Sequence, residues 1–375
     1  MKQIGILTTW NSVCGCSELA HHWVCAMERL GYQVTIFGNH FAGTCQPIDS
    51  RKDDPQNVFR IFHTGHQTDE KLRKEFDLAK LKDICTKREI TAFFVIGSLW
   101  NYPDKEGIKG IIDFIKNTQR GSVYYLANDV CFLDGQWENY HWDSILYPKI
   151  LQVHPGIKAL RNGIMIDHGM PEYTPPQVRE YFYDPEAFNW IGSFGLGRNR
   201  IQDLVPVVKE LNQEKQIGRS YRIAISLPSQ HAYEENKQFF LENQDILQPR
   251  VGYLEELSLL NFLHSMGAVT VWYHNNSSLS CSSGIRMALS AEVPVLGNCS
   301  SWTADFHRSG AWIEFNGEPT GIKAELKKLF ESGNSHYQFK REQLVLHQRY
   351  LKSTSGWNAI AKQYLALVEG DITKT

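Results

Sequence analysis

The stretch that decides the fold is residues 267–298, which reads GAVTVWYHNNSSLSCSSGIRMALSAEVPVLGN. Residues 269–273 form a short run of β-branched and aromatic side chains, which predicts a buried strand. A polar loop follows, and then an apolar segment at 285–291 that predicts a helix. Residues 293–296 predict a second strand, so the whole stretch indicates one βαβ unit.

The start of this predicted helix is suited to an anion. Ser282 or Ser283 could cap it, and Gly284 is small enough to let a ligand approach the backbone. Because a helix N-terminus carries free N–H groups and the positive end of the helix dipole, a phosphate is its natural ligand. An ordinary connection within an α/β sheet has the same pattern, and this stretch alone leaves both interpretations open. Arg286, one turn into the helix, could reach the phosphate or face solvent.

Length and composition narrow the classes of protein to which this chain could belong. The 375 residues favour two domains, and the 42% hydrophobic content with 28 glycines is typical of a globular α/β protein. The formal net charge of −2 gives no overall electrostatic reason to bind nucleic acid or an anionic membrane. No apolar run approaches the length of a membrane span, and the first apolar segment is too short for a signal peptide.

The cysteines and histidines predict no metal site. Cys14 and Cys16 are the only close pair of cysteines, and they lack the CxxC spacing. His63 and His66 could pair on a metal, but no third ligand is evident. The eight cysteines are scattered through predicted strands, helices and loops, which favours reduced thiols in a cytoplasmic protein over a disulfide framework.

Two successive series of alternating strands and helices are predicted. The chain opens with a strand at 3–8, a helix capped by Ser17 and a strand at 33–37, the usual start of a doubly wound sheet. A proline-rich segment at 170–184 separates the two series. The predicted organisation is an N-terminal Rossmann-like domain at 1–170, a hinge at 171–186, a C-terminal Rossmann-like domain at 187–350 and a terminal helix at 351–375. A cleft between the two domains, at the carboxyl ends of both sheets, is the expected ligand site.

This organisation resembles the GT-B glycosyltransferases, in particular the GT4-like retaining group. The order and spacing of four segments carry the resemblance across nearly the whole chain, since no single segment is specific. They are Thr9, Trp10 and Asn11 with Cys14, Gly15, Ser17 and Glu18; Ile191 and Gly192 with Gly197, Arg198, Asn199 and Arg200; residues 283–289 with Val293, Pro294 and Val295; and Ser355, Gly356 and Trp357.

The resemblance implies transfer of a sugar from a nucleotide-diphosphate sugar, such as a UDP- or GDP-sugar, with retention and without an obligatory metal. It implies that the C-terminal domain binds the donor, that the N-terminal domain binds the acceptor, and that the last helix crosses back to the N-terminal domain. This sequence departs from the family pattern at three places. Leu279 and Met287 stand where the family usually carries two glutamates eight positions apart, and Asn128 stands where it carries a histidine.

Candidate residues for the donor phosphates lie in the C-terminal half. Arg198 and Arg200 flank a glycine-rich turn and could hold the leaving diphosphate, although two arginines at a solvated helix start would give the same pattern. Ser282, Ser283 and Gly284 could donate backbone N–H groups to the same phosphates, with simple helix capping as the alternative.

The N-terminal half supplies the remaining candidates. Gly15 and Cys16 lie in a loop that resembles the family's diphosphate-facing loop, although a tight turn without function would give the same pattern. Asp129 follows an apolar strand and could deprotonate an acceptor hydroxyl, or cap a turn. Asn128 and His168 could contact the substrate, although a lone histidine is more often structural.

Three hypotheses for function follow. The first is a cytoplasmic glycosyltransferase that uses a nucleotide sugar and an unidentified acceptor, which could be a glycan, a lipid or a small molecule. The second is a non-catalytic protein of the same fold that binds a sugar nucleotide or a partner. The third is a phage-type enzyme that glycosylates a nucleic-acid base, against which the net charge of −2 argues mildly.

Overall fold

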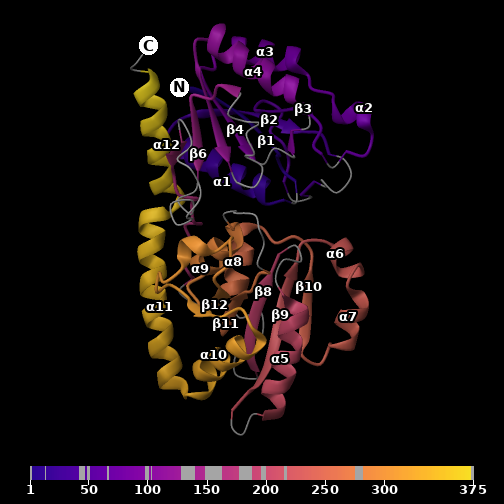
Figure 1. Ribbon diagram of the computed structural model, residues 1–375, viewed down its shortest axis with the longest axis vertical. Helices are drawn as coiled ribbons and strands as arrows, with labels where there is room; N and C mark the ends of the chain where they lie inside the picture. Colours follow the sequence, from indigo (N-terminus) through magenta and orange to yellow (C-terminus); the bar gives the residue numbers. More distant parts are fainter. Residues whose placement is uncertain are drawn as a thin grey trace. The chain divides into compact units, whose positions relative to one another are not determined.

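The computed structural model describes residues 2–12, 14–41, 47–48, 51–65, 67–97, 101–102, 104–127, 140–147, 163–176, 188–195, 200–214, 218–274 and 282–372. The chain divides into two compact units (Figure 1). The first holds Met1–Gly169 and Trp357–Thr375, and the second holds Met170–Ser277 and Ser282–Gly356. Each unit is built on one parallel sheet with helices packed against it, as the sequence predicts for an α/β protein.

In the described part of the first unit, seven parallel strands form one sheet in the order β3-β2-β1-β4-β5-β6-β7. The strands are β1 Gln3–Thr8, β2 Gln33–Asn39, β3 Val58–Phe62, β4 Ala92–Gly97, β5 Ser122–Ala127, β6 Ser144–Tyr147 and β7 Gly163–Met165. The helices are α1 Gly15–Arg29, α2 Glu70–Arg73, α3 Leu78–Lys87, α4 Lys105–Asn117 and α12 Trp357–Ile372. Strand β4 is buried at all of its positions, as expected when helices cover both faces of a parallel sheet.

Helix α12 belongs to the core of the first unit, although it lies far from that unit in the sequence. The Trp23 ring of α1 lies 4.7 Å from the Phe94 ring of β4 and 5.8 Å from the Tyr364 ring of α12. A Cβ atom at Gly169 would lie 2.3 Å from the Trp357 ring, so only glycine fits beside that indole. These contacts confirm the expectation that the terminal helix crosses back to the N-terminal unit.

In the described part of the second unit, six parallel strands form a sheet in the order β10-β9-β8-β11-β12-β13. The strands are β8 Phe188–Phe194, β9 Ser220–Leu227, β10 Leu247–Val251, β11 Ala268–Val271, β12 Val295–Asn298 and β13 Ile313–Phe315. The helices are α5 Ile201–Glu214, α6 Gln230–Glu234, α7 Lys237–Glu242, α8 Glu256–His264, α9 Ser283–Ser290, α10 Pro319–Glu331 and α11 Asn334–Ser355, with a 3₁₀ turn, η4, at Ala304–Phe306.

The stretch at 267–298 forms the predicted βαβ unit. Strand β11 pairs with β12 in parallel, with Val269 opposite Val295, and helix α9 connects them. All four residues of β11 are buried, and they sit between the two clusters of apolar side chains that cover the sheet. The strand ends two residues earlier than predicted, and Trp272 and Tyr273, the latter in a single β-bridge, contribute to the site described below.

Three local predictions differ from the structure. The charged amphipathic segment at 71–88 predicts one helix, but the structure has two, because Asp77 caps α3 and Phe76 bridges to Phe62 between them. The segment at 232–242 likewise predicts one helix, and the structure divides it at Asn236 into α6 and α7. Helix α1 is capped by the Cys14 thiol rather than by Ser17. Among the described residues, no helix combines the length and the apolar character needed to cross a membrane.

Candidate functional site

The N-terminus of α9 is held by a serine cap. Ser282 Oγ accepts hydrogen bonds from the backbone N–H groups of Gly284, at 3.1 Å, and Ile285, at 3.4 Å. The Ser282 N–H donates to Trp302 O at 3.2 Å. Of the two serines considered from the sequence, Ser282 is therefore the cap. Two of the three N–H groups expected to bind phosphate already have acceptors within the protein, so an anion there would compete with Ser282 Oγ.

The Tyr273 hydroxyl contacts this serine cap. Its hydroxyl lies 3.0 Å from Ser282 Oγ, and both side chains are buried. A Cβ atom at Gly284 would lie 2.5 Å from the Tyr273 hydroxyl oxygen. The tyrosine therefore favours glycine at position 284, whether or not a ligand also approaches there.

The ends of β11 and β12 are joined by an asparagine side chain. Asn298 Oδ1 accepts from the Tyr273 N–H, and Asn298 Nδ2 donates to Tyr273 O, each at 2.9 Å. Asn298 is 4% exposed. Since both bonds of the amide are shielded from water, they hold Tyr273, and through it the start of α9, in a fixed position.

Arg200 lies just before α5 and is packed rather than solvated. Its guanidinium carbon lies 4.4 Å from the Trp272 ring centroid, and its Nη1 donates to Gly317 O at 3.0 Å. Its Nε donates to Asp203 at 2.5 Å, and its backbone N–H donates to Trp272 O at 2.9 Å. Nη2 has no hydrogen-bond partner among the described residues, so this corner of the guanidinium can still bind an anion.

The Gly317 carbonyl ties these groups to the end of β13. It accepts from Trp272 Nε1 as well as from Arg200, each at 3.0 Å. Gly317 has a φ of +82°, a conformation that glycine adopts without strain. Trp272 thus contacts Arg200, and the adjacent residue, Tyr273, contacts the α9 cap. The structure brings Arg200 and Ser282–Gly284 to the same edge of the second sheet.

Arg286 does not face solvent. Its guanidinium is buried, pairs with Asp305, and donates to Ser282 O at 3.0 Å. It also lies 4.8 Å from the Phe306 ring centroid. Arg286 therefore fastens the β12–β13 connection to the first turn of α9.

The predicted loop of the first unit is a helix start. Cys14 Sγ accepts from the Ser17 N–H at 3.4 Å, and Ser17 Oγ accepts from the Ser12 N–H at 3.1 Å. Gly15 and Cys16 are the first two residues of α1. A Cβ atom at Gly15 would meet no heavy atom within 4 Å, so packing does not require glycine at this position. Open space beside the backbone at a helix N-terminus would admit a ligand.

The remaining predicted residues are less informative. His168 is buried in the first unit, with its Nδ1 2.9 Å from Gly169 O and its ring 5.6 Å from the Trp357 ring. These contacts fit a structural histidine. Asn128, Asp129 and Arg198 lie outside the described residues.

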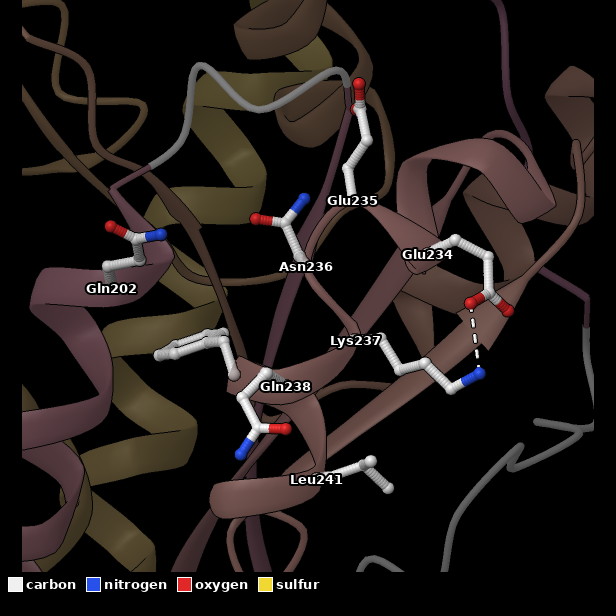
Figure 2. Close-up of a pocket in the computed structure, with 8 residues that line it drawn as sticks. Gln202, Glu234, Glu235, Asn236, Lys237, Gln238 and Leu241 are labelled. Atoms are coloured by element: carbon white, nitrogen blue, oxygen red, sulfur yellow. Dashed lines mark hydrogen bonds and ion pairs between the residues drawn. The ribbon is translucent and has the colours of Figure 1, made fainter.

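An open hollow of about 620 Å³ lies elsewhere on the second unit, between the first turn of α5 and the helices α6 and α7 (Figure 2). Gln202, Glu234, Asn236 and Lys237 line it, and Glu234 and Lys237 pair at 3.0 Å. The side chains of that pair remain about half exposed. Small-molecule sites bury most of their ligand's surface, and these exposed walls do not. We assign the hollow no role.

Sequence reasoning missed three residues that build the site, namely Trp272, Tyr273 and Asn298. A signal for them exists, because polar or amphipathic side chains directly after buried parallel strands lie at the carboxyl edge of the sheet, where ligands bind. Asn298 ends β12, and Trp272 and Tyr273 follow β11.

Comparison with known proteins finds no matching family model and no curated protein that matches in sequence. Solved structures do match over almost the whole chain. A glycosyltransferase from Rickettsia africae has a TM-score of 0.69 at 10% identity and covers 100% of this chain and 99% of its own. Anabaena HepE in complex with UDP-glucose has a TM-score of 0.62 at 11% identity, with 99% and 100% covered.

A third structure, an α-glucosyltransferase in complex with UDP-glucose and DNA containing an abasic site, has a TM-score of 0.62 at 15% identity. It covers 98% of this chain and 99% of its own. Identities this low establish the architecture rather than the chemistry. The chain has the GT-B fold that these glycosyltransferases share.

Proposed function

We propose that this protein is a glycosyltransferase that moves a sugar from a nucleotide-diphosphate sugar to an acceptor hydroxyl or amine. One observation carries the proposal: Arg200 and the N-terminus of α9 meet at the carboxyl edge of the second sheet, on a GT-B fold. That edge is where open α/β sheets bind ligands. The donor diphosphate is the ligand that suits an arginine beside a helix N-terminus.

The proposed reaction breaks the bond between the anomeric carbon and the diphosphate oxygen, and the diphosphate leaves with the bonding electrons. The acceptor oxygen or nitrogen forms the new glycosidic bond and loses its proton to a base, for which Asp129 is our candidate. The helix dipole of α9 and the Nη2 of Arg200 stabilise the charge that develops on the diphosphate. Arg198, Gly15 and Cys16 are the further candidates for phosphate contact.

We further propose a GT4-like enzyme that retains the anomeric configuration and needs no metal for transfer. The dipole and arginines take the place that a metal would fill. The donor domain spans 187–350, the acceptor domain spans 1–170 with His168 and Asn128 as candidate contacts, the hinge spans 171–186, and the terminal helix spans 351–375. UDP-glucose is the first donor to test, because HepE and the α-glucosyltransferase are described in complex with it, with a GDP-sugar as the alternative. We also propose a cytoplasmic location, because the eight cysteines are scattered along the sequence rather than spaced as a disulfide framework.

A non-catalytic binding protein is the second candidate. The observation that favours it is Met287, which packs on the apolar core of the second unit where the GT4-like pattern expects a glutamate. A sugar-nucleotide binder needs the phosphate contacts and can dispense with that carboxylate. The DNA-bound α-glucosyltransferase keeps a nucleic-acid acceptor as the third candidate.

A nucleotide-sugar panel tests the proposal. Thermal unfolding is followed with UDP- and GDP-sugars, since a ligand at 100 times its Kd stabilises the native state by about 2.7 kcal/mol. The donor that raises the melting temperature is then assayed for hydrolysis and transfer. Binding with turnover supports the enzyme, and binding without turnover supports the non-catalytic protein. If no nucleotide sugar changes the melting temperature, the proposal is wrong.

A further inference from the structure

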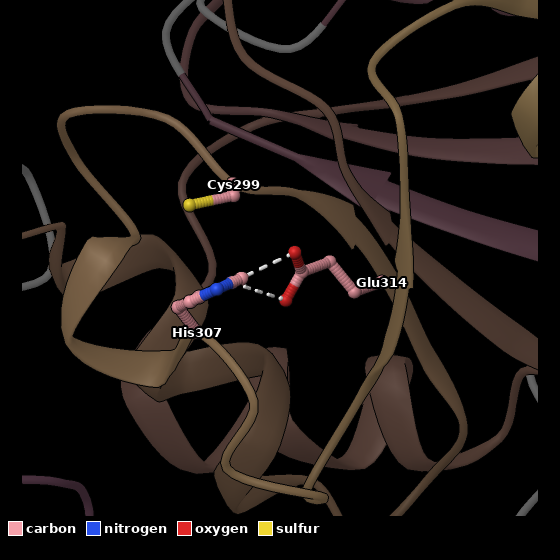
Figure 3. Close-up of side chains that lie close together, drawn as sticks. All are labelled: Cys299, His307 and Glu314. Atoms are coloured by element: carbon pink, nitrogen blue, oxygen red, sulfur yellow. Dashed lines mark hydrogen bonds and ion pairs between the residues drawn. The ribbon is translucent and has the colours of Figure 1, made fainter.

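Three side chains that carry metal-binding atoms lie close together on the second unit (Figure 3). They are Cys299, His307 and Glu314. Their ligand atoms all lie within 4.8 Å of one another, and no other group of this kind occurs within the described ranges. His307 Nδ1 lies 2.9 Å and 3.0 Å from the two carboxylate oxygens of Glu314.

The register of the sheet explains how two of the three meet. In the pairing of β12 with β13, Gly297 lies opposite Glu314. Because side chains alternate along a strand, the residue two positions after Gly297 faces the same side as Glu314. That residue is Cys299, which directly follows the last residue of β12.

The third side chain comes from a tight turn in the β12–β13 connection. His307 follows η4, and its backbone N–H donates to Ala304 O at 3.2 Å. Arg308 has a φ of +56°, and its N–H lies 3.4 Å from Glu314 Oε2. The turn therefore aims the imidazole at the carboxylate, and three separate parts of the chain supply the three groups.

We propose that Cys299, His307 and Glu314 form a zinc site. Thiolate sulfur, imidazole nitrogen and carboxylate oxygen are together the ligand set of zinc, whereas magnesium and calcium take oxygen ligands. The His307 and Glu314 side chains are 39% and 27% exposed, so an ion can enter and a water can fill the fourth position. Binding forms a zinc–sulfur bond and releases the thiol proton to solvent.

The geometry needs only small side-chain movements. With bonds of roughly 2.0–2.3 Å, neighbouring ligand atoms in a tetrahedral zinc site lie roughly 3.4–3.6 Å apart. The His307–Glu314 contact must open by about half an ångström, and the separations of up to 4.8 Å must close by about one. Exposed side chains on a turn and an edge strand can move this far without shifting the backbone.

Zinc binding would also affect the stability of the β12–β13 connection. The β12–β13 connection supplies Trp302 O, which accepts from Ser282 N–H, and Asp305, which pairs with Arg286. Bound zinc would link residues near both ends of this connection. It would thereby stabilise the contacts that the connection makes with the first turn of α9. The inference rests on the cluster alone and stands whether or not the protein transfers sugar.

Zinc and cobalt titrations test the proposal. The metal-free full-length protein is titrated with ZnCl₂ by calorimetry, and with CoCl₂ while its absorption is recorded. We expect one zinc per chain, a thiolate-to-cobalt charge-transfer band, and protection of Cys299 from alkylation. Cys299→Ser, His307→Gln and Glu314→Gln should each weaken zinc binding by more than about 100-fold and abolish the band.

Two matched controls separate a site from scattered metal binding. Cys25→Ser removes a thiol that lies 3.8 Å from the His21 imidazole, and His231→Gln removes an exposed imidazole paired with Glu235 at 3.2 Å. Both controls should bind zinc as the parent does. All variants are first checked for parental melting without metal, and any that fails is set aside in favour of the other two. If the parent binds no zinc, or Cys299→Ser and His307→Gln bind it as tightly as the parent, the cluster is an ion pair beside a thiol and the proposal fails.

Discussion

Tyr273 and Asn298 exchange two hydrogen bonds of 2.9 Å, so that an asparagine side chain extends the sheet between β11 and β12 by one rung. Replacing Asn298 by leucine keeps the volume but leaves the buried Tyr273 N–H and C=O without partners. We expect a loss of about 2–5 kcal/mol in the free energy of unfolding, since each unpaired buried group costs about 1–3 kcal/mol. Urea denaturation measures it, and Asn236→Ala, at an exposed position, is the control. Parental stability in Asn298→Leu would contradict this role.

Gly284 and Tyr273 should be coupled. Gly284→Ala places a Cβ atom 2.5 Å from the Tyr273 hydroxyl oxygen, and we expect overpacking to cost about 1–3 kcal/mol. Tyr273→Phe removes that oxygen, so the same alanine in the Phe background should cost little, because alanine is a better helix former than glycine. A double-mutant cycle on unfolding free energies measures the coupling. Additive effects would mean that the two residues do not interact.

Gly15 offers a cleaner test of ligand approach than Gly284. A Cβ atom there meets nothing within 4 Å, so Gly15→Ala should leave the unfolding free energy unchanged or slightly higher. If a diphosphate approaches the start of α1, the methyl group should weaken nucleotide-sugar binding about tenfold, or about 1.4 kcal/mol. Calorimetric titration measures it, and Gly370→Ala, which also fills open space, is the control. Unchanged affinity would remove Gly15 from the site.

Arg200 should contribute to donor affinity. Arg200→Ala removes a charge-assisted contact, and we expect weaker binding by about 1.5–3 kcal/mol. The same substitution at Arg198 should have a similar effect. Arg222→Ala is the matched control, because its guanidinium carbon also lies over a ring, 3.9 Å from the Phe188 centroid. Stability is measured alongside, since Arg200 also holds Asp203 and Gly317. If the Arg200 variant is folded and binds the donor like the parent, the phosphates lie elsewhere.

Glu292 should make the free energy of unfolding depend on pH. Burial alone would raise the pKa of its carboxyl, but hydrogen bonds from Arg349, at 2.7 Å, and Lys352, at 2.5 Å, hold the pKa below its usual value of 4.5. A lowered pKa means that the carboxylate stabilises the fold above about pH 4.5, and that this contribution is lost as the pH falls through the lowered value. Urea denaturation between pH 7 and pH 3 should show a steeper acid loss in the parent than in Glu292→Gln. Equal slopes would contradict the assignment.

Much of the fold was predictable because its signals are local and periodic. The apolar runs of β11 and β12, the Ser282 cap and the glycine at the start of α1 each act over a few residues. The contacts that shape the site are of another kind. Asn298 meets Tyr273 across 25 residues, and Gly317 O meets Arg200 across 117. The Tyr273–Asn298 pair depends on where β11 ends, which the apolar run does not mark, and the Arg200–Gly317 pair depends on segments far apart in the chain, which one sequence does not bring together.

The proposed zinc site and the close approach of Gly284 to Tyr273 illustrate the same limit. Cys299, His307 and Glu314 have no familiar spacing, and they are brought together by the register of β12 against β13 and by the turn at His307. From the sequence, Gly284→Val is expected to leave the fold largely intact, because valine costs a helix only a few tenths of a kcal/mol relative to other ordinary residues. The Tyr273 hydroxyl, nine residues from Ser282, predicts an overpacking cost that the sequence does not show.

The place of α12 in the first unit has a consequence for biosynthesis. Trp357 and Tyr364 fill the core beside Trp23, yet the ribosome makes them only after every residue of the second unit. A nascent chain that has emerged as far as residue 350 therefore carries an uncovered apolar surface on α1. Until the second unit has been translated, the first unit keeps this apolar surface exposed, where it can bind chaperones or aggregate.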